Sequence, residues 1–305
     1  MTTHRLLNAA PGANSGTGTG TARFVQPLVT RIAGSTPLVL DSPHSGTHYP
    51  DDFRAACDLA TLRRAEDTHV EKIYSFAPAL GAAWIEAHFP RIYLDANRDT
   101  TELDTSLLDG IWSDPLASDP AALSKLRLGK GLVWKSTDEG LPVYDRLLSP
   151  DEVRARIANC WVPYHAAVQQ AIEAAHARHG YSIHINCHSM PSVAGSHATL
   201  YPGLVHADFV VGDRDGSTAS AALSQFICGQ LRACGYSVEH NHPYKGVELV
   251  RRYGDPARQR HSVQLEINRR LYMNEQTLAL KHAGFARLRT DLHFLVQQLL
   301  AYDPR

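Results

Sequence analysis

The sequence predicts a single α/β domain in which a mixed central sheet lies between helices. Short apolar or β-branched runs that end at turn residues alternate along the chain with longer segments of helical periodicity. This alternation is typical of a largely parallel or mixed sheet that is covered on both faces. The length of 305 residues allows one large domain or two smaller ones, and we predict one.

The predicted strands are short runs bounded by turn residues. They are residues 37–41, 83–87, 91–95, 181–187, 209–212, 236–239 and 262–267. Helices are predicted where apolar residues recur with helical spacing. In residues 153–172 this apolar stripe follows the run Ser149 to Glu152, which supplies a helix cap and first turn. The other predicted helices are residues 59–77, 219–231 and 275–300.

Two segments depart from this alternation. Residues 1–24 are predicted to be a flexible arm, because the stretch from Pro11 to Ala22 is rich in Gly, Thr, Ser and Ala and has little to pack. Residues 25–305 then form the domain. Within it, residues 100–148 are rich in Gly, Asp and Pro and are too long for an ordinary connection. We expect them to be a loop-rich insertion near a functional site.

The composition indicates a soluble globular protein that binds neither nucleic acid nor membrane. Charged residues make up 20%, and 30 Lys+Arg against 31 Asp+Glu leave a formal net charge of -1. No apolar run approaches the ~20 residues of a membrane span, and the N-terminus lacks the apolar core of a signal peptide. Five scattered cysteines without a CxxC pair argue against disulfides and cysteine-bound zinc, so we expect a cytoplasmic location. The oligomeric state stays open.

Polar residues gather at the ends of four predicted strands. The segments are Asp41 to His48, Asp95 to Asp99, Asn186 to Ser189 and Glu266 to Arg269. In an open α/β sheet, ligands bind beyond the carboxyl ends of the strands. The sequence therefore places possible metal ligands, proton carriers and cations at one edge of the sheet.

His44 and His188 are the predicted ligands of one zinc ion per chain. Each directly follows a predicted strand and has small neighbours that leave space for a metal. A mononuclear catalytic zinc takes about three His, Asp or Glu ligands and keeps an open position for water. Asp67, in the first predicted helix, is the expected third ligand. The further candidate ligands are Glu66, His69 and His48.

Three more residues have predicted roles next to this metal. Arg98, beside Asn97, offers a rigid fork that grips a carboxylate at two points, so this pair is a candidate anchor for an acidic substrate. Otherwise Arg98 forms an ion pair with a nearby aspartate. Glu266 lies in an alternating run and is a candidate proton carrier. Its structural alternative is an ion pair with Arg269 or Arg270.

Six motifs then occur in order along roughly residues 25 to 300. They are PHSGTHYP, EDTHV, YLDANRD, NCHSMP, GDRDG and QLEINRRLYMNE. Together they resemble the N-formylglutamate amidohydrolase (N-formylglutamate deformylase) family, which acts in histidine degradation. That family is similar to the zinc carboxypeptidase and aspartoacylase superfamily, so the resemblance implies a zinc-carboxypeptidase-like fold with a mixed eight-stranded sheet and one zinc ion.

The resemblance also implies site residues. His188 looks like the later ligand histidine, Asn97 and Arg98 like the carboxylate-binding pair, and Glu266 like the general base. The first zinc motif of the superfamily is His-x-x-Glu, but Thr47 stands where its Glu would follow His44. The acidic ligand must therefore come from elsewhere, and Asp67 remains an inference.

The implied reaction is hydrolysis of the formyl amide of N-formyl-L-glutamate to formate and L-glutamate. A substrate with two carboxylates needs a second cation, for which the candidates are Arg251, Arg252, Lys245 and Arg269. One alternative is hydrolysis of another N-acyl amino acid, and another is non-catalytic binding of acidic ligands, which would not need Glu266. A thiol hydrolase that uses Cys187 beside His188 is disfavoured, because adjacent strand residues point to opposite faces.

Overall fold

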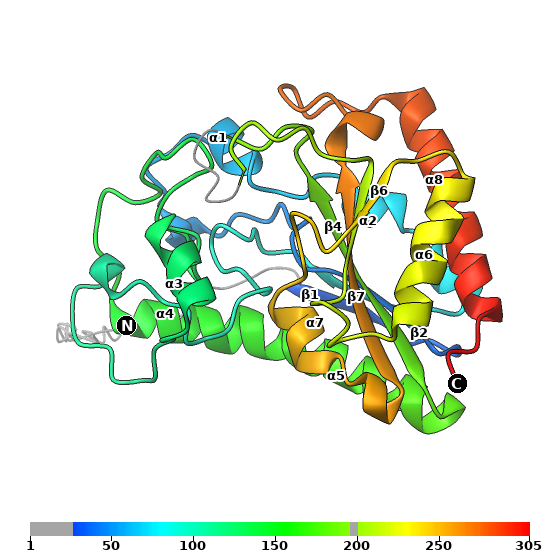
Figure 1. The fold of residues 1–305 in the computed structure, drawn as a ribbon. Coiled ribbons are helices and arrows are strands. Elements are labelled where there is room, and N and C mark those ends of the chain that lie inside the picture. The colour runs from blue at the N-terminus through cyan, green and yellow to red at the C-terminus, as the bar shows by residue number, and fades with distance from the viewer. Residues whose placement is uncertain (1–26, 196–200) are drawn as a thin grey trace, which may run out of the picture.

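A computed structural model describes residues 27–195 and 201–305, and the predicted arm of residues 1–24 lies outside them. The described residues contain one seven-stranded sheet with the order β1-β3-β2-β4-β7-β5-β6 (Figure 1). The strands are β1 (Val29–Ile32), β2 (Leu38–Ser42), β3 (Ala83–Ala87), β4 (Ser182–Met190), β5 (Phe209–Gly212), β6 (Val238–His240) and β7 (Arg260–Asn268). The prediction of an α/β domain with a mixed sheet is confirmed.

The sheet is mixed because the strands at both of its edges run opposite to the four central strands. Strands β3, β2, β4 and β7 are parallel neighbours. Strand β1 pairs with β3 antiparallel, and β5 pairs with β7 antiparallel. Because these four strands are parallel, their carboxyl ends meet at one edge of the sheet. The metal-ligand candidates on or after the strands lie at that edge.

Helices cover both faces of the sheet. Figure 1 shows α6 and α8 side by side on one face, with α5 on the other. The helices are α1 (Leu59–Arg63), α2 (Val70–Ile73), α3 (Pro120–Arg127), α4 (Pro150–Arg156), α5 (Val162–His179), α6 (Ala221–Ala233), α7 (Glu248–Tyr253) and α8 (His282–Ala301). Short 3-10 turns lie at η1 (Asp51–Phe53), η2 (Ala77–Leu80), η3 (Thr105–Leu107), η5 (Pro256–Arg258) and η6 (Arg269–Leu271), and η4 (Ile157–Trp161) is a π-helical turn.

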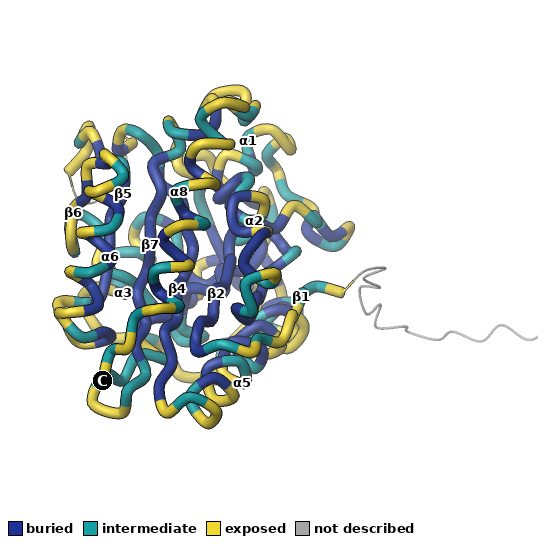
Figure 2. The backbone as a smooth tube through the Cα atoms, turned by 90° about the vertical axis from the view of Figure 1, so that its right-hand side faces the viewer, coloured by how far each residue is buried: buried dark blue, intermediate teal, exposed yellow. Residues whose placement is uncertain are grey.

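The alternation of side chains along β2 separates two hydrophobic cores. Leu38 and Leu40 belong to the core beneath α2, α6 and α8, whereas Val39 belongs to the core beneath α5. Figure 2 shows the inner strands β2, β4 and β7 as almost continuously buried. On β4 the face that lies toward α5 instead carries buried polar residues. These residues are His184, Asn186 and His188.

A buried hydrogen-bond network ties these polar residues to the elements around them. Asp41 accepts hydrogen bonds from Tyr164 of α5 (2.6 Å) and Asn186 of β4 (2.8 Å). It also contacts His184 Nε2 at 2.9 Å, and His184 Nδ1 lies 2.6 Å from Ser262 Oγ of β7. Because every buried polar group here has a partner, the network holds β2, β4 and β7 in fixed register below the site.

The prediction of a strand at residues 91–95 is wrong. Pro90 opens a turn there, in which the backbone N–H groups of Tyr93 and Leu94 donate to its carbonyl. The apolar side chains of this turn are buried although the segment does not pair with the sheet. The prediction was wrong because a short buried run has the same sequence pattern as a strand. Strand β1 was missed because it is short and half-exposed at the sheet edge. The described residues thus form seven strands, whereas the family resemblance implies eight.

The predicted helix over residues 59–77 is also wrong as a continuous element. It is interrupted between α1 and α2, where His69 adopts a left-handed conformation with φ of 72° and the Asp67 N–H donates to the His44 carbonyl at 3.0 Å. Asp67 consequently lies in a turn and not in a helix. Tertiary contacts override the apolar periodicity at this point.

Residues 100–148 are loop-rich and contain η3 and α3. Within this segment, Leu132, Val133 and Trp134 are buried in the core beneath α5. The segment is therefore packed against the rest of the domain. All five cysteines lie in the described residues, and none of them is in a disulfide there. None of the described helices combines the length and apolarity of a membrane span.

Candidate active site

The carboxyl ends of β2, β4 and β7 bring the chemical groups of the site together. His44 lies in the loop just after β2, and His188 lies near the carboxyl end of β4. Glu266 is the direct neighbour of His188 in register on β7. His188 therefore belongs to its strand and does not follow it as predicted. Gly46 lets the loop after β2 approach the chain closely, because a Cβ there would lie 2.3 Å from the Phe89 carbonyl oxygen.

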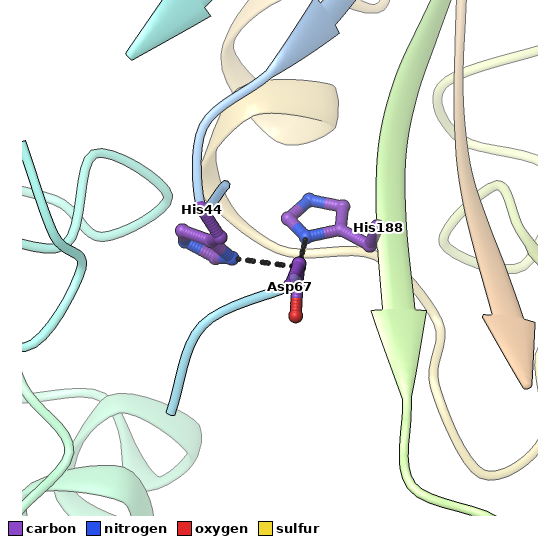
Figure 3. Close-up of side chains that lie close together, drawn as sticks. All are labelled: His44, Asp67 and His188. Carbon is purple, nitrogen blue, oxygen red and sulfur yellow. Dashed lines mark hydrogen bonds and ion pairs between the residues drawn. The ribbon is translucent and has the colours of Figure 1, made fainter. Parts of the chain in front are cut away.

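The structure brings His44, Asp67 and His188 into one buried group whose candidate ligand atoms all lie within 4.8 Å of one another. Figure 3 shows both imidazole rings directed at the same carboxylate. Asp67 Oδ2 lies 2.9 Å from His188 Nδ1 and 3.4 Å from His44 Nδ1. The ring centroids of the two histidines are 4.6 Å apart.

The other nitrogen of each histidine has a fixed partner. His44 Nε2 lies 2.6 Å from Asp95 Oδ1, and His188 Nε2 lies 2.7 Å from Asn186 Oδ1. Ligand histidines are typically oriented by such an oxygen acceptor, which leaves the opposite nitrogen to face the metal. His44 Nδ1 is buried without a hydrogen-bond partner in the described residues. This orphaned nitrogen fits a metal ion bound between the two Nδ1 atoms and Asp67.

Asp67 divides its two oxygens between different partners. Oδ2 faces the histidines, whereas Oδ1 accepts a hydrogen bond from Arg269 Nη2 at 3.1 Å and lies 3.7 Å from Arg91 Nη1. Burial alone would raise the pKa of this carboxyl, but the histidines and Arg91 hold it well below its usual range. Asp67 is therefore held as a carboxylate, with Oδ2 directed at both histidines.

The other candidate ligands lie outside this group. Glu66 accepts a hydrogen bond from Tyr49 at 2.8 Å and pairs with Arg63. His69 Nε2 lies 2.9 Å from the Leu278 carbonyl oxygen. Among the described residues the group does not include His48 either.

Asn97 is a structural link of the site. Its Oδ1 accepts a hydrogen bond from the Leu249 N–H at the start of α7 (2.9 Å), and its Nδ2 lies 3.1 Å from His188 Nε2 and 3.4 Å from Gln264 Oε1. Both ends of the side-chain amide thus have protein partners. Asn97 thus links His188 to the start of α7 and also lines the cavity, and its predicted contact with the substrate stays a prediction.

Glu266 is a buried carboxyl group beside the group of His44, Asp67 and His188. Its Oε1 accepts a hydrogen bond from Gln264 Nε2 at 2.8 Å, and Oε2 makes no hydrogen bond to any described residue. Burial and the charge of Asp67 outweigh the attraction of His188 and raise the pKa of Glu266. A raised pKa suits a group that must take up a proton and release it again.

A cavity of about 370 Å³ opens beside these residues, and His44, His188 and Glu266 line it. The insertion forms one wall through Lys125, Lys130, Trp134, Asp138 and Glu139. Six cationic side chains face the cavity. They are Arg64, Arg91, Arg98, Lys125, Lys130 and Arg269.

Arg98 lines the cavity with a guanidinium that the protein only partly uses. Its Nε donates to the Lys130 carbonyl at 3.0 Å and its Nη1 to the Asn97 carbonyl at 3.4 Å. Its nearest carboxylate is Glu102, at the long distance of 3.9 Å. Arg98 can therefore still accept a carboxylate ligand through Nη2.

The predicted candidates for the second cation have other partners. Arg251 and Arg252 both bind Glu248 and Asp99, Lys245 pairs with Asp215, and none of the three lines this cavity. Arg269 does line it, but its guanidinium donates four hydrogen bonds to protein oxygens, one of them to Asp67. Arg269 therefore positions Asp67, the candidate ligand.

Residues 36–273 match the model of the N-formylglutamate amidohydrolase family. The chain belongs to this family. The N-formylglutamate deformylase of Pseudomonas aeruginosa is 29% identical over 280 residues, which are 88% of this chain and 94% of the relative. The N-formylglutamate amidohydrolase of Ralstonia eutropha JMP134 superposes with a TM-score of 0.84 at 42% identity, over 91% of this chain and 98% of that one.

A more distant solved structure, a gene product of Agrobacterium tumefaciens, shares the fold with a TM-score of 0.61 at 18% identity. The superposition covers 90% of this chain and 94% of the Agrobacterium chain. The family match spans the metal-ligand candidates, Glu266 and the whole of the insertion. The site thus lies in the part of the chain that defines an N-formylglutamate amidohydrolase.

Sequence reasoning missed two residues that line this cavity, Arg91 and Lys125, and the contacts of a third, Asp95. Arg91 and Asp95 were assigned to a strand, but Arg91 binds Asp95 at 3.0 Å, and Asp95 Oδ1 lies 2.6 Å from His44 Nε2. The spacing of four between these opposite charges was the available signal. Lys125 lies in the insertion, where no local pattern marks a residue that faces a cavity.

Proposed function

We propose that this chain hydrolyses the formyl amide of N-formyl-L-glutamate to formate and L-glutamate with one bound zinc ion. The observation that carries the proposal is the buried group of His44, Asp67 and His188 beside Glu266, at a cavity lined by cations. Family membership supports the substrate. We place the reaction in the cytoplasm and in histidine degradation, in keeping with the family and with the free thiols.

The zinc ligands of the proposal are His44, Asp67 and His188. When bound there, zinc supplies polarisation of the formyl oxygen and acidification of a water molecule. Asp95 and Asn186 hold the two imidazoles in the ligating tautomer.

Glu266 accepts a proton from the attacking water and delivers it to the departing amine nitrogen. Oxygen from water bonds to the formyl carbon, the carbon–nitrogen bond breaks, and formate and the amino group of glutamate result. Arg98 binds a substrate carboxylate and thereby orients the amide over the ligand group. The buried Cys187 takes no part, since its side chain lies in the opposite core and burial raises the pKa of its thiol.

The decisive experiment is a formate-release assay on purified protein with known zinc content. We expect N-formylglutamate to be cleaved, the activity to disappear with a chelator and to return with zinc. N-Formylglutamine and N-formylleucine should be cleaved far less well, because a buried cation that loses its partner anion is desolvated without compensation. Comparable kcat/KM values for N-formylleucine and N-formylglutamate would exclude the named substrate. Binding of N-formylglutamate without cleavage would instead favour a non-catalytic binder.

Arg98→Lys is expected to lower kcat/KM for N-formylglutamate by ~10-fold or more, the scale of one lost hydrogen bond to a charged group. An ammonium lacks the planar fork by which Nε donates to the Lys130 carbonyl while Nη2 stays available for the substrate carboxylate. Arg251→Lys is the matched control, because that arginine lies outside the cavity. Equal losses in the two variants would remove Arg98 from substrate binding.

A further inference from the structure

Among the described residues, one cation of the cavity has no counter-ion. The other five each form an ion pair with a carboxylate of the protein. The pairs are Arg64–Glu139, Arg91–Asp95, Arg98–Glu102, Lys130–Asp138 and Arg269–Asp67. Lys125, on α3 of the insertion, forms no ion pair or hydrogen bond through its ammonium with any described residue.

The surroundings of Lys125 make this lack of a partner costly. Burial, followed by the positive charges of Arg98, Lys130 and Arg91, lowers the pKa of Lys125 to about 8, and Glu102 opposes them only weakly. A partly buried ammonium among three other cations gains most from an anion that enters from the cavity. The partner that suits Lys125 is therefore an anionic group of a ligand bound in the cavity.

The placement of Arg98 and Lys125 assigns them to different carboxylates. Arg98 follows Asn97, whose amide nitrogen lies 3.1 Å from His188, so Arg98 lies near the amide that is cleaved. The α-carboxylate of the substrate is attached to the carbon next to that amide. Lys125 comes from α3 of the insertion and is not part of the group of His44, Asp67 and His188. The side-chain carboxylate, two carbons farther along, suits this position.

We propose that Lys125 binds the side-chain carboxylate of the substrate and selects glutamate over residues with uncharged side chains. This proposal rests on the proposed function. Lys125 takes the role that the sequence analysis suggested for Arg251, Arg252, Lys245 or Arg269. The insertion thereby has a direct role in substrate specificity.

The test is Lys125→Met, with kcat/KM measured for N-formylglutamate and for N-formylglutamine. We expect the ratio of the two values to fall by about 10- to 100-fold, the scale of a lost charged hydrogen bond. Lys125→Arg should keep more of the ratio than Lys125→Met, because it keeps the charge. Lys245→Met is the matched control and should leave the ratio unchanged, since Lys245 pairs with Asp215 outside the cavity.

A third substrate separates the two carboxylates. In 4-(formylamino)butanoate the side-chain carboxylate is kept and the α-carboxylate is missing. The loss caused by Lys125→Met should persist with this compound. If the loss disappears, Lys125 binds the α-carboxylate and the assignment is overturned.

The pH profile provides an independent readout. An ammonium is cationic below its pKa, so the form that binds the carboxylate is lost as the pH rises through about 8. The kcat/KM for N-formylglutamate should fall above that pH relative to N-formylglutamine, and this difference should vanish in Lys125→Met. The charged groups that act on Lys125 are Arg91, Arg98, Lys130 and Glu102.

Two outcomes overturn the proposal in distinguishable ways. If Lys125→Met changes kcat/KM for both substrates by the same factor, or for neither, Lys125 does not select the side chain while the proposed reaction stands. If the parent protein releases no formate from N-formylglutamate, the proposed function fails and this proposal fails with it.

Discussion

Glu266→Gln is expected to lower kcat for N-formylglutamate by at least ~10²-fold, the usual scale for losing a general base. Glutamine has nearly the same shape and can keep the contact with Gln264, but it cannot accept the proton of the attacking water. Since the ligand atoms belong to other residues, zinc content and KM should stay close to those of the parent. Steady-state kinetics and metal analysis of the same preparation check both statements.

A matched control for Glu266→Gln is Glu139→Gln. Glu139 is another carboxylate that lines the cavity, but it binds Arg64 on the exposed side. This variant should retain most of its turnover. If Glu266→Gln loses its metal, Glu266 is a ligand and another base is needed. If it turns over like the parent, Glu266 has no role in proton transfer.

The strands were predictable from sequence where burial and pairing coincide. Strands β3 and β5 have the predicted bounds because both are short buried runs between turns. Residues 91–95 carry the same signal but lie in a turn, and β1 lacks the signal because half of it is exposed. A single sequence reports burial, whereas membership of a sheet depends on which segments lie next to each other.

The site was predictable where a strand end placed the residue. His44, His188 and Glu266 were found because topology brings the ends of parallel strands together. The residues that support them depend on long-range contacts, such as Arg269 reaching the turn that holds Asp67. No periodicity marks such contacts, which is why the choice between Asp67 and Glu66 needed the structure.

That choice predicts a difference between two adjacent residues. Asp67→Asn should weaken zinc binding much more than Glu66→Gln, since an amide keeps the shape of Asp67 but loses the charge that zinc prefers. His44→Ala gives the upper limit of the effect, because it removes a ligand outright and should abolish both bound zinc and activity. Zinc affinity is measured by competition with a chromogenic chelator, and formate release is measured in parallel.

The pair is well matched, because both carboxylates are buried and both are paired with an arginine. The partners differ in exposure, because the side chain of Arg63 is 38% exposed and that of Arg269 is 11% exposed. Thermal unfolding of the metal-free proteins should consequently show a larger loss of stability for Asp67→Asn than for Glu66→Gln. Zinc affinity is therefore compared at a temperature at which both variants are folded. Full zinc occupancy in His44→Ala would contradict the ligand set. The reverse order of affinities would move the third ligand to Glu66, although its oxygens bind Tyr49 and Arg63 and only Asp67 directs an oxygen at both histidines.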